Sequence, residues 1–200
     1  MNHPTFYTSV PKIQLIEPLY ELFGVNNNGV VEFSFSDVVK IAGHACPTVA
    51  GAYLMTYHGL KALYVDEIPI RGNHQILFSS AENEGVTGVI SNIMGTIVGS
   101  SGVGGFKGLG GQFSRNNHLH FNQVLSSSVS MKRLDTNQII NIDYHPELIP
   151  SSKEMSPLLT KILSFTAAES EKLEFQNHWN QRLEKILNAG FNNSGLIKIF

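Results

Sequence analysis

The segment over 48–64 begins with TVAGAYLM, which places small or apolar residues on nearly every side of a helix. Pro47 precedes it, and proline suits the first turn of a helix because its φ is already helical and its missing N–H has no partner there. A helix without a polar face must be surrounded by other elements. The sequence therefore predicts a helix over 48–64 that is buried at its N-terminal end.

Further helices and strands are predicted from the spacing of apolar residues and from capping signals. One helix is predicted over 11–23, where Gly24 ends it, and another begins at Asp37 with Ser36 as its N-cap. A third lies within EGVTGVISNIMGTIVGSSG, and a fourth begins at Ser156 and Pro157. The last lies over 167–189, with a capping box from Thr166 to Glu169 and Gly190 at its end. The predicted strands lie over 75–82, 118–125, 128–134 and 138–144, and the final LIKIF is either an edge strand or a partner-binding tail. This order predicts the α+β class, with a mixed or antiparallel sheet packed on helices and a C-terminal helix.

Length and composition predict one globular domain. The chain has 200 residues, of which 42% are hydrophobic, so it can bury a core without disulfide bonds or structural metal ions. We expect a core over about 11–145 and a helical segment over about 155–190, within a single domain over 1–200. Only 15% of the residues are charged, which predicts more buried or more self-associating surface than a typical monomer has.

Charge and hydropathy argue against several classes of function. The formal net charge is −2 and no basic run occurs, so we expect no nucleic-acid partner. No window approaches the roughly 20 apolar residues of a membrane span, and the N-terminus lacks the cationic start of a signal peptide. These features predict a cytoplasmic protein with no membrane partner. A single cysteine excludes an internal disulfide.

That cysteine, Cys46, lies in KIAGHACPTVAG, two positions after His44. Imidazole and thiolate both bind zinc and other borderline-soft divalent ions, and Gly43 lets the backbone turn so that both side chains can converge. Cys46 also stands at the expected N-cap of the buried helix, where the helix dipole favours a thiolate. The pair predicts either a site for zinc or another divalent transition metal or a nucleophilic thiol, while a lone cysteine can also be plain packing.

The surroundings of this pair resemble the FmdE-like family. A G-H-x-C-P turn followed by a small-residue helix is the recognisable core of that family, and here it is GHACP followed by VAGAYLM. The resemblance covers roughly residues 35–125 and is strongest over 37–58. It implies an α+β core domain, intertwined dimers and a metal ion near the His-x-Cys turn, with His44 and Cys46 as ligands.

Two departures from the family pattern affect the metal. Some members carry a C-terminal zinc-finger module, which we do not expect here because no cysteine follows Cys46. Members usually place a second cysteine, with an acidic residue soon after, where a strand runs into the second helix, but here SSAENEGVTGVI holds only Glu82 and Glu84. The resemblance then implies either a changed ligand set, in which Glu84, Glu82 or a histidine takes the missing place, or loss of the metal.

His118 and His120 alternate along a predicted strand, so both would point to one face, close enough to share an ion. If that strand passes near the GHACP turn, the two histidines complete a His/Cys site with His44 and Cys46. The alternative is a solvated strand face.

The stretch GSSGVGGFKGLGGQF, over 99–113, is rich in glycine. Backbone N–H groups in such a loop can bind an anion, but the stretch matches neither of the common glycine-rich nucleotide motifs. It therefore predicts a flexible lid or a close-packed turn. Lys107 and Arg115 are candidates to hold a small anionic substrate.

Three functional hypotheses remain open. The leading one is a metal-binding protein with His44, Cys46, His118, His120 and Glu84 as ligands, which becomes a metal-dependent enzyme if the ion keeps an open position. The second is a metal-free enzyme in which Cys46 is the catalytic nucleophile. The third is a non-catalytic structural or partner-binding domain. Metal content separates the first from the others, and thiol reactivity separates the second from the third.

Overall fold

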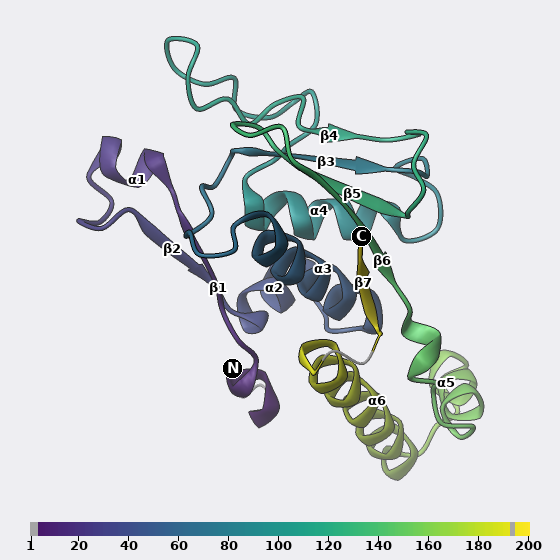
Figure 1. Ribbon diagram of the computed structural model, residues 1–200. Helices are drawn as coiled ribbons and strands as arrows, with labels where there is room; N and C mark the ends of the chain where they lie inside the picture. Colours follow the sequence, from purple (N-terminus) through teal and green to yellow (C-terminus); the bar gives the residue numbers. More distant parts are fainter. Residues whose placement is uncertain (1–3, 193–194) are drawn as a thin grey trace.

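The computed structural model of the chain describes residues 4–192 and 195–200 (Figure 1). The helices are α1 (Pro18–Phe23), α2 (Phe35–Ala42), α3 (Pro47–Leu63), α4 (Thr87–Val98), α5 (Met155–Leu163) and α6 (Glu169–Phe191), with short 3₁₀ turns at Thr5–Ser9 and Pro146–Leu148. The strands are β1 (Ile13–Ile16), β2 (Val30–Phe33), β3 (His74–Phe78), β4 (Leu119–His120), β5 (Val129–Arg133), β6 (Ile139–Tyr144) and β7 (Ile197–Ile199). The prediction of an α+β fold is confirmed.

The strands form two sheets. β1 and β2 make an antiparallel pair, and the larger sheet has the order β4-β3-β5-β6-β7. Within it, β3 and β4 are parallel and all other neighbours are antiparallel, so the sheet is mixed as predicted. The predicted LIKIF strand is confirmed at the edge, where β7 pairs with β6.

Helix α3 occupies the centre of the core, as its sequence predicts. It packs against β6, α4 and α6, and its residues from Val49 to Thr56 are all buried. Glycines allow the close approach of its neighbours, because a Cβ on Gly59 would stand only 2.9 Å from Cδ1 of Ile142. The lack of a polar face is therefore explained by partners on every side.

The predicted helix over 11–23 is wrong in its first half. Ile13 and Leu15 are buried and Gln14 between them is exposed, which is the alternation of a strand, and this segment pairs with β2. Only the part from Pro18 onward is helical, with the Glu17 side chain as its N-cap. In so short a stretch, the spacing of the apolar residues fits the period of a helix as well as that of a strand, and pairing with β2 decided for the strand.

Other predicted boundaries also differ, and the predicted strand over 75–82 ends at Phe78. The N-cap of α2 is Ser34 rather than Ser36, and Asp37 completes the capping box. Strand β4 is far shorter than the predicted 118–125, since the chain turns at Asn122, which has φ of 56°. Helix α6 begins at Glu169, where the Ala168 N–H donates to the Glu171 carboxylate at 2.9 Å, instead of the predicted box from Thr166.

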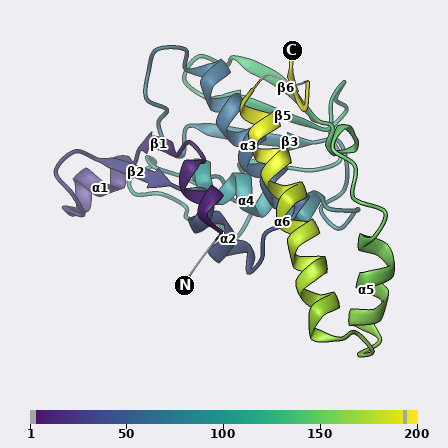
Figure 2. The same ribbon diagram turned by 90° about the horizontal axis from the view of Figure 1, so that it is seen from below.

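Helices α5 and α6 form a hairpin that extends away from the sheet (Figures 1 and 2). The C-terminal half of α6 packs on α3, where Leu183, Ile186 and Leu187 are buried and Gly190 contacts Leu54. No helix among the described residues combines the length and apolarity that crossing a membrane requires.

Candidate functional site at the N-terminus of α3

The GHACP turn connects α2 to α3. Gly43 ends α2 with φ of 75°, a left-handed conformation that glycine adopts without strain. Three residues later Cys46 is the N-cap of α3, with extended backbone, and Pro47 takes the first helical position. The Cys46 sulfur accepts a hydrogen bond from the Val49 N–H at 3.5 Å. The sulfur therefore lies at the positive end of a long buried helix, as the sequence predicts.

The His44 ring has one nitrogen engaged. Its Nδ1 lies 3.1 Å from the carbonyl oxygen of Ala42. A carbonyl only accepts, so this hydrogen bond requires the proton on Nδ1 and leaves the Nε2 lone pair available. Metal-binding histidines are commonly held in this way by a backbone carbonyl. The imidazole is exposed and Cys46 is half-buried, so both are accessible from solvent.

Two aromatic side chains from distant parts of the chain hold the turn. The Trp179 Nε1–H on α6 donates to the Ala45 carbonyl at 2.8 Å, and the Tyr144 hydroxyl donates to the Pro47 carbonyl at 2.9 Å. Burial raises the pKa of Tyr144, so its hydroxyl remains a donor at neutral pH. The Tyr144 ring lies directly against Gly51, where a Cβ would stand 2.2 Å from the ring.

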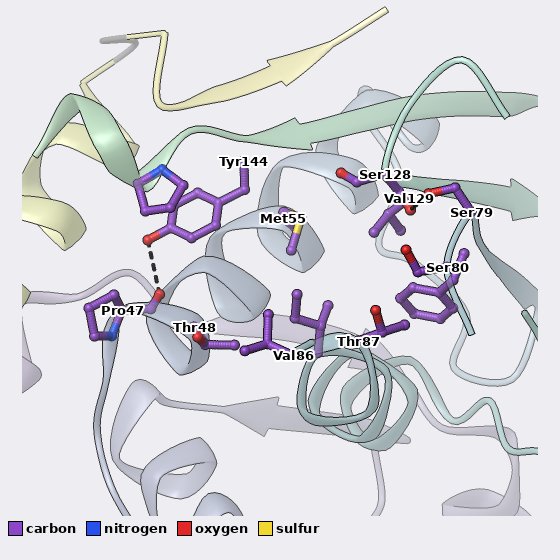
Figure 3. A pocket seen from close by; sticks show the side chains of 13 residues that line it. Pro47, Thr48, Met55, Ser79, Ser80, Val86, Thr87, Ser128, Val129 and Tyr144 are labelled. Carbon is purple, nitrogen blue, oxygen red and sulfur yellow. Dashed lines mark hydrogen bonds between the residues drawn. The ribbon is translucent and has the colours of Figure 1, made fainter. Parts of the chain in front are cut away.

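A cavity of about 240 Å³ adjoins the turn, and we call it the α3–α4 cavity (Figure 3). Pro47 and Tyr144 lie at one end and Ser80 and Ser128 at the other (Figure 3). The complete lining is mainly apolar with several hydroxyl groups: Pro47, Thr48, Met55, Phe78, Ser79, Ser80, Val86, Thr87, Ile90, Ser128, Val129, Tyr144 and Pro146.

The first residues of both α3 and α4 contribute to this lining, and Thr48 and Thr87 are the hydroxyl-bearing residues among them. Helix N-termini present unpaired N–H groups and a partial positive charge. The cavity therefore suits a small molecule that has an apolar part and an anionic or strongly polar end.

Among the described residues, the other predicted ligands do not form a group of three or more with the turn. The Glu84 carboxylate accepts the Ala81 N–H at 3.3 Å within the loop between β3 and α4. Within residues 4–192 and 195–200, no three His, Cys, Asp or Glu side chains are grouped closely enough to hold a metal ion. The structure thus brings His44 and Cys46 into one turn but does not gather all five predicted ligands.

The strand register determines the face of the sheet on which His120 lies. His120 pairs with Leu77, whereas Ile76 and Phe78 on the other face of β3 are buried in the core. Successive side chains of a strand point to opposite faces, so His120 lies on the face away from the buried core and from α3.

The glycine-rich stretch is a hydrogen-bonded loop. The Arg115 N–H donates to the Phe106 carbonyl at 2.8 Å, and the Ser101 N–H donates to the Arg115 carbonyl at 2.8 Å. These bonds favour the predicted close-packed turn over a free lid. Lys107 is exposed, but Arg115 is buried and paired with Glu17 at 2.6 Å. The two cations predicted to hold an anion therefore lie in very different environments.

Trp179 and Tyr144 are the contributors that sequence reasoning missed. The sequence predicts Trp179 only as part of the helix over 167–189 and Tyr144 only as the end of the strand over 138–144. The one available signal was that Trp179 is the chain's single tryptophan, on a helix that is otherwise largely polar.

Fold and site together define an α+β protein in which a His-x-Cys turn and an adjoining cavity stand at the N-terminus of a buried helix. The chain belongs to the FmdE family. The family model described as "FmdE, Molybdenum formylmethanofuran dehydrogenase operon" matches residues 41–193, about three quarters of the chain, and so confirms the resemblance. No curated protein matches the chain at a significant level.

Proposed function

We propose that the chain binds a divalent transition metal, such as zinc, through the Nε2 of His44 and the sulfur of Cys46. The observation that carries the proposal is the hydrogen bond between the His44 Nδ1 and the Ala42 carbonyl, because it leaves Nε2 as a donor for a metal. The position of the Cys46 sulfur supports it, since the side chain is half-buried at the start of α3, in the same turn as His44.

Two protein ligands leave open positions on a four-coordinate ion. A closed structural zinc site uses four protein ligands, whereas a catalytic site leaves room for water or substrate. Water, a substrate or a residue of a second subunit would fill the remaining positions. Glu84, His118 and His120 are not part of this proposal, because the structure does not group them with the turn.

The α3–α4 cavity would hold the substrate, which we propose is small and anionic. The N-termini of α3 and α4 line this cavity and favour negative charge, and Thr48, Ser80 and Thr87 offer hydroxyl groups. When bound, the metal would supply Lewis acidity beside the cavity. The proposal names no reaction. The cytoplasmic location and the single domain over 1–200 remain predictions.

Elemental analysis of protein purified without a metal-affinity column tests the metal. We expect near-stoichiometric metal in the wild type, loss of it in both Cys46→Ser and His44→Ala, and retention in His178→Ala. His178 is a histidine of α6 outside the turn, so it controls for nonspecific histidine binding. A wild-type protein that stays metal-free after incubation with zinc would refute the proposal.

A second candidate function is a metal-free enzyme with Cys46 as nucleophile. It is favoured by the position of the sulfur at the start of α3, one residue from the cavity-lining Pro47. The rate of Cys46 alkylation against pH tests it, and a midpoint well below the ordinary thiol value of about 8.5 would support it. An inert thiol without metal would leave the third hypothesis, a non-catalytic partner-binding domain.

We also infer that the chain forms a homodimer through the α5–α6 hairpin. Its tip exposes apolar side chains, with Leu163 at 69% and Phe165 at 97% exposure. Such side chains favour burial by a second copy. Light scattering should give twice the 22.0 kDa chain mass for the wild type, and a lower mass for Phe165→Lys. Val103→Lys, at an exposed site on another loop, should leave the mass unchanged.

A further inference from the structure

A second cavity, of about 450 Å³, lies at the other end of β3, and we call it the arginine cavity. Its lining combines two arginines with polar and apolar residues: Pro18, Ile70, Arg71, Gly72, Asn73, Phe113, Ser114, Arg115, His118, Leu134 and Asp135. Asn73 precedes the first residue of β3, whereas Phe78 at the last residue lines the α3–α4 cavity. The two cavities are therefore separate sites.

Both arginines of this cavity share one buried carboxylate. The Arg71 Nη1 lies 2.7 Å from Oε2 of Glu17, and the Arg115 Nη2 lies 2.6 Å from Oε1 of the same residue. The Glu17 side chain is only 2% exposed and the Arg115 side chain 8%. Two guanidinium groups and one carboxylate give the group Arg71–Glu17–Arg115 a net charge of +1. A buried charge is costly unless it is paired, so this excess charge favours a negative ligand.

One other carboxylate, that of Asp135, lines this cavity. Asp135 is engaged by Arg133, at 2.8 Å from its Nε and 3.0 Å from its Nη2. Arg133 also pairs with the Glu67 carboxylate at 2.7 Å, but the Glu67 side chain is 65% exposed and does not line the cavity. Arg71 also donates to the carbonyl oxygens of Ile97 and Thr96. The free donor capacity therefore belongs to Arg115.

Two polar atoms of the lining lack partners. The Nη1 of Arg115 and the Nδ1 of His118 are buried and have no hydrogen-bond partner among residues 4–192 and 195–200. A buried donor without a partner destabilises the fold, and more so if it is charged. Burial lowers the pKa of His118, so its ring is neutral at pH 7 and can carry its proton on Nδ1. Both groups are thus available as donors.

The Arg115 guanidinium packs against two glycines, which have no side chain at the place that it occupies. A Cβ on Gly72 would stand 1.7 Å from its Nη1, and a Cβ on Gly99 would stand 2.5 Å from the same atom. The planar group therefore fits against the backbone of both glycines. A pre-positioned donor loses little conformational entropy when it binds a ligand.

We propose that the arginine cavity binds a small anion, a carboxylate or a phosphate, through the Nη1 of Arg115 and the Nδ1 of His118. The anion balances the excess positive charge and accepts the two unpaired donors. Because both atoms are covered in the structure, we expect the residues around them to shift as the anion enters. This site is independent of the metal proposed at His44 and Cys46.

Calorimetric titration of the full chain tests the proposal, with inorganic phosphate and acetate in separate experiments at constant ionic strength set with chloride. We expect saturable binding of at least one anion. NMR signals of the His118 ring and the Arg115 guanidinium should shift along the same curve. Binding of phosphate alone or acetate alone identifies which class the site takes.

Arg115→Lys is the main variant, because a lysine can still pair with Glu17 but has no second arm for the anion. We expect affinity to fall about tenfold, which corresponds to about 1.4 kcal/mol, because the lysine loses one charge-assisted hydrogen bond to the anion. His118→Gln provides the same test if Arg115→Lys fails to fold. Lys107→Gln removes an exposed cation from the same loop without touching the cavity and should bind as the wild type does.

Two results would overturn the proposal. One is the absence of saturable binding of either anion by the folded wild type, which would mean that Arg71, Glu17 and Arg115 only hold the fold together. The other is binding that survives in Arg115→Lys and His118→Gln but is lost in Lys107→Gln, which would place the anion on the outside of the loop.

Discussion

The indole N–H of Trp179 donates a 2.8 Å hydrogen bond to the carbonyl oxygen of Ala45, across 134 positions of the sequence. Ala45 stands between His44 and Cys46, so the contact ties helix α6 to the middle of the candidate site. The orientation of both candidate ligands therefore depends on a helix that is distant in the chain.

Replacing Trp179 by Phe removes the donor and keeps an aromatic ring. We expect the free energy of unfolding to fall by about 1–1.5 kcal/mol in urea denaturation, because the Ala45 carbonyl loses its partner. The alkylation rate of Cys46 should also change, since the turn is released. Phe175→Leu alters a neighbouring ring of α6 and should leave that rate unchanged. Equal rates in all three proteins would show that the bond does not position the turn.

Replacing Gly51 by Ala tests the contact between α3 and β6. The new Cβ would stand 2.2–2.7 Å from the Tyr144 ring, so the ring must move and its bond to the Pro47 carbonyl is strained. Overpacking of this kind costs about 1–3 kcal/mol, measurable by urea denaturation. Gly102→Ala is the matched control, since a Cβ there has open space. A Gly51→Ala protein as stable as this control would contradict the packing argument.

Replacing Glu17 by Gln tests the buried ion group. The change leaves Arg71 and Arg115 without their shared carboxylate, and breaking a buried ion pair costs about 3–5 kcal/mol of folding free energy. Glu32→Gln breaks the exposed pair with Lys12 and should cost at most about 1 kcal/mol. Chemical denaturation of both variants at pH 7 gives the comparison. Similar small losses would mean that Glu17 is solvated in solution.

The buried imidazole of His74 should make the free energy of unfolding depend on pH. Burial, with a smaller effect from Arg133, lowers the pKa of this fully buried imidazole to about 3. The ordinary value is about 6.5, so between these values the unfolded chain binds the proton and the folded chain does not. Stability due to neutral His74 is therefore complete above about pH 6.5 and falls by up to about 1.4 kcal/mol per pH unit as the solution is acidified.

His74→Leu should remove this dependence. Both ring nitrogens lack partners among the described residues, so the variant should keep its stability at pH 7. Its free energy of unfolding should change less between pH 6.5 and 4.5 than that of the wild type. His145→Gln, which alters a more exposed histidine paired with Glu147, should keep the wild-type slope. Equal slopes in wild type and His74→Leu would contradict the assignment.

Sequence reasoning succeeded where a local pattern had only one physical solution. Helix α3 has no polar face, so burial was the only stable arrangement, and Cys46 before Pro47 had to lie at its N-cap. The pattern of β1 was different. Ile13 and Leu15 suit a strand or a helix in a segment this short, and only pairing with β2 settled the matter.

By itself, the sequence determined the buried helix, the His-x-Cys turn at its start and the membership of the family that this turn indicates. The tertiary structure alone decided that His118 faces an arginine cavity instead of Cys46, and that Trp179 and Tyr144 hold the turn. The reason is physical. A helix cap depends on residues a few positions apart, whereas the face of a strand that meets a given loop depends on how the whole sheet packs against the helices.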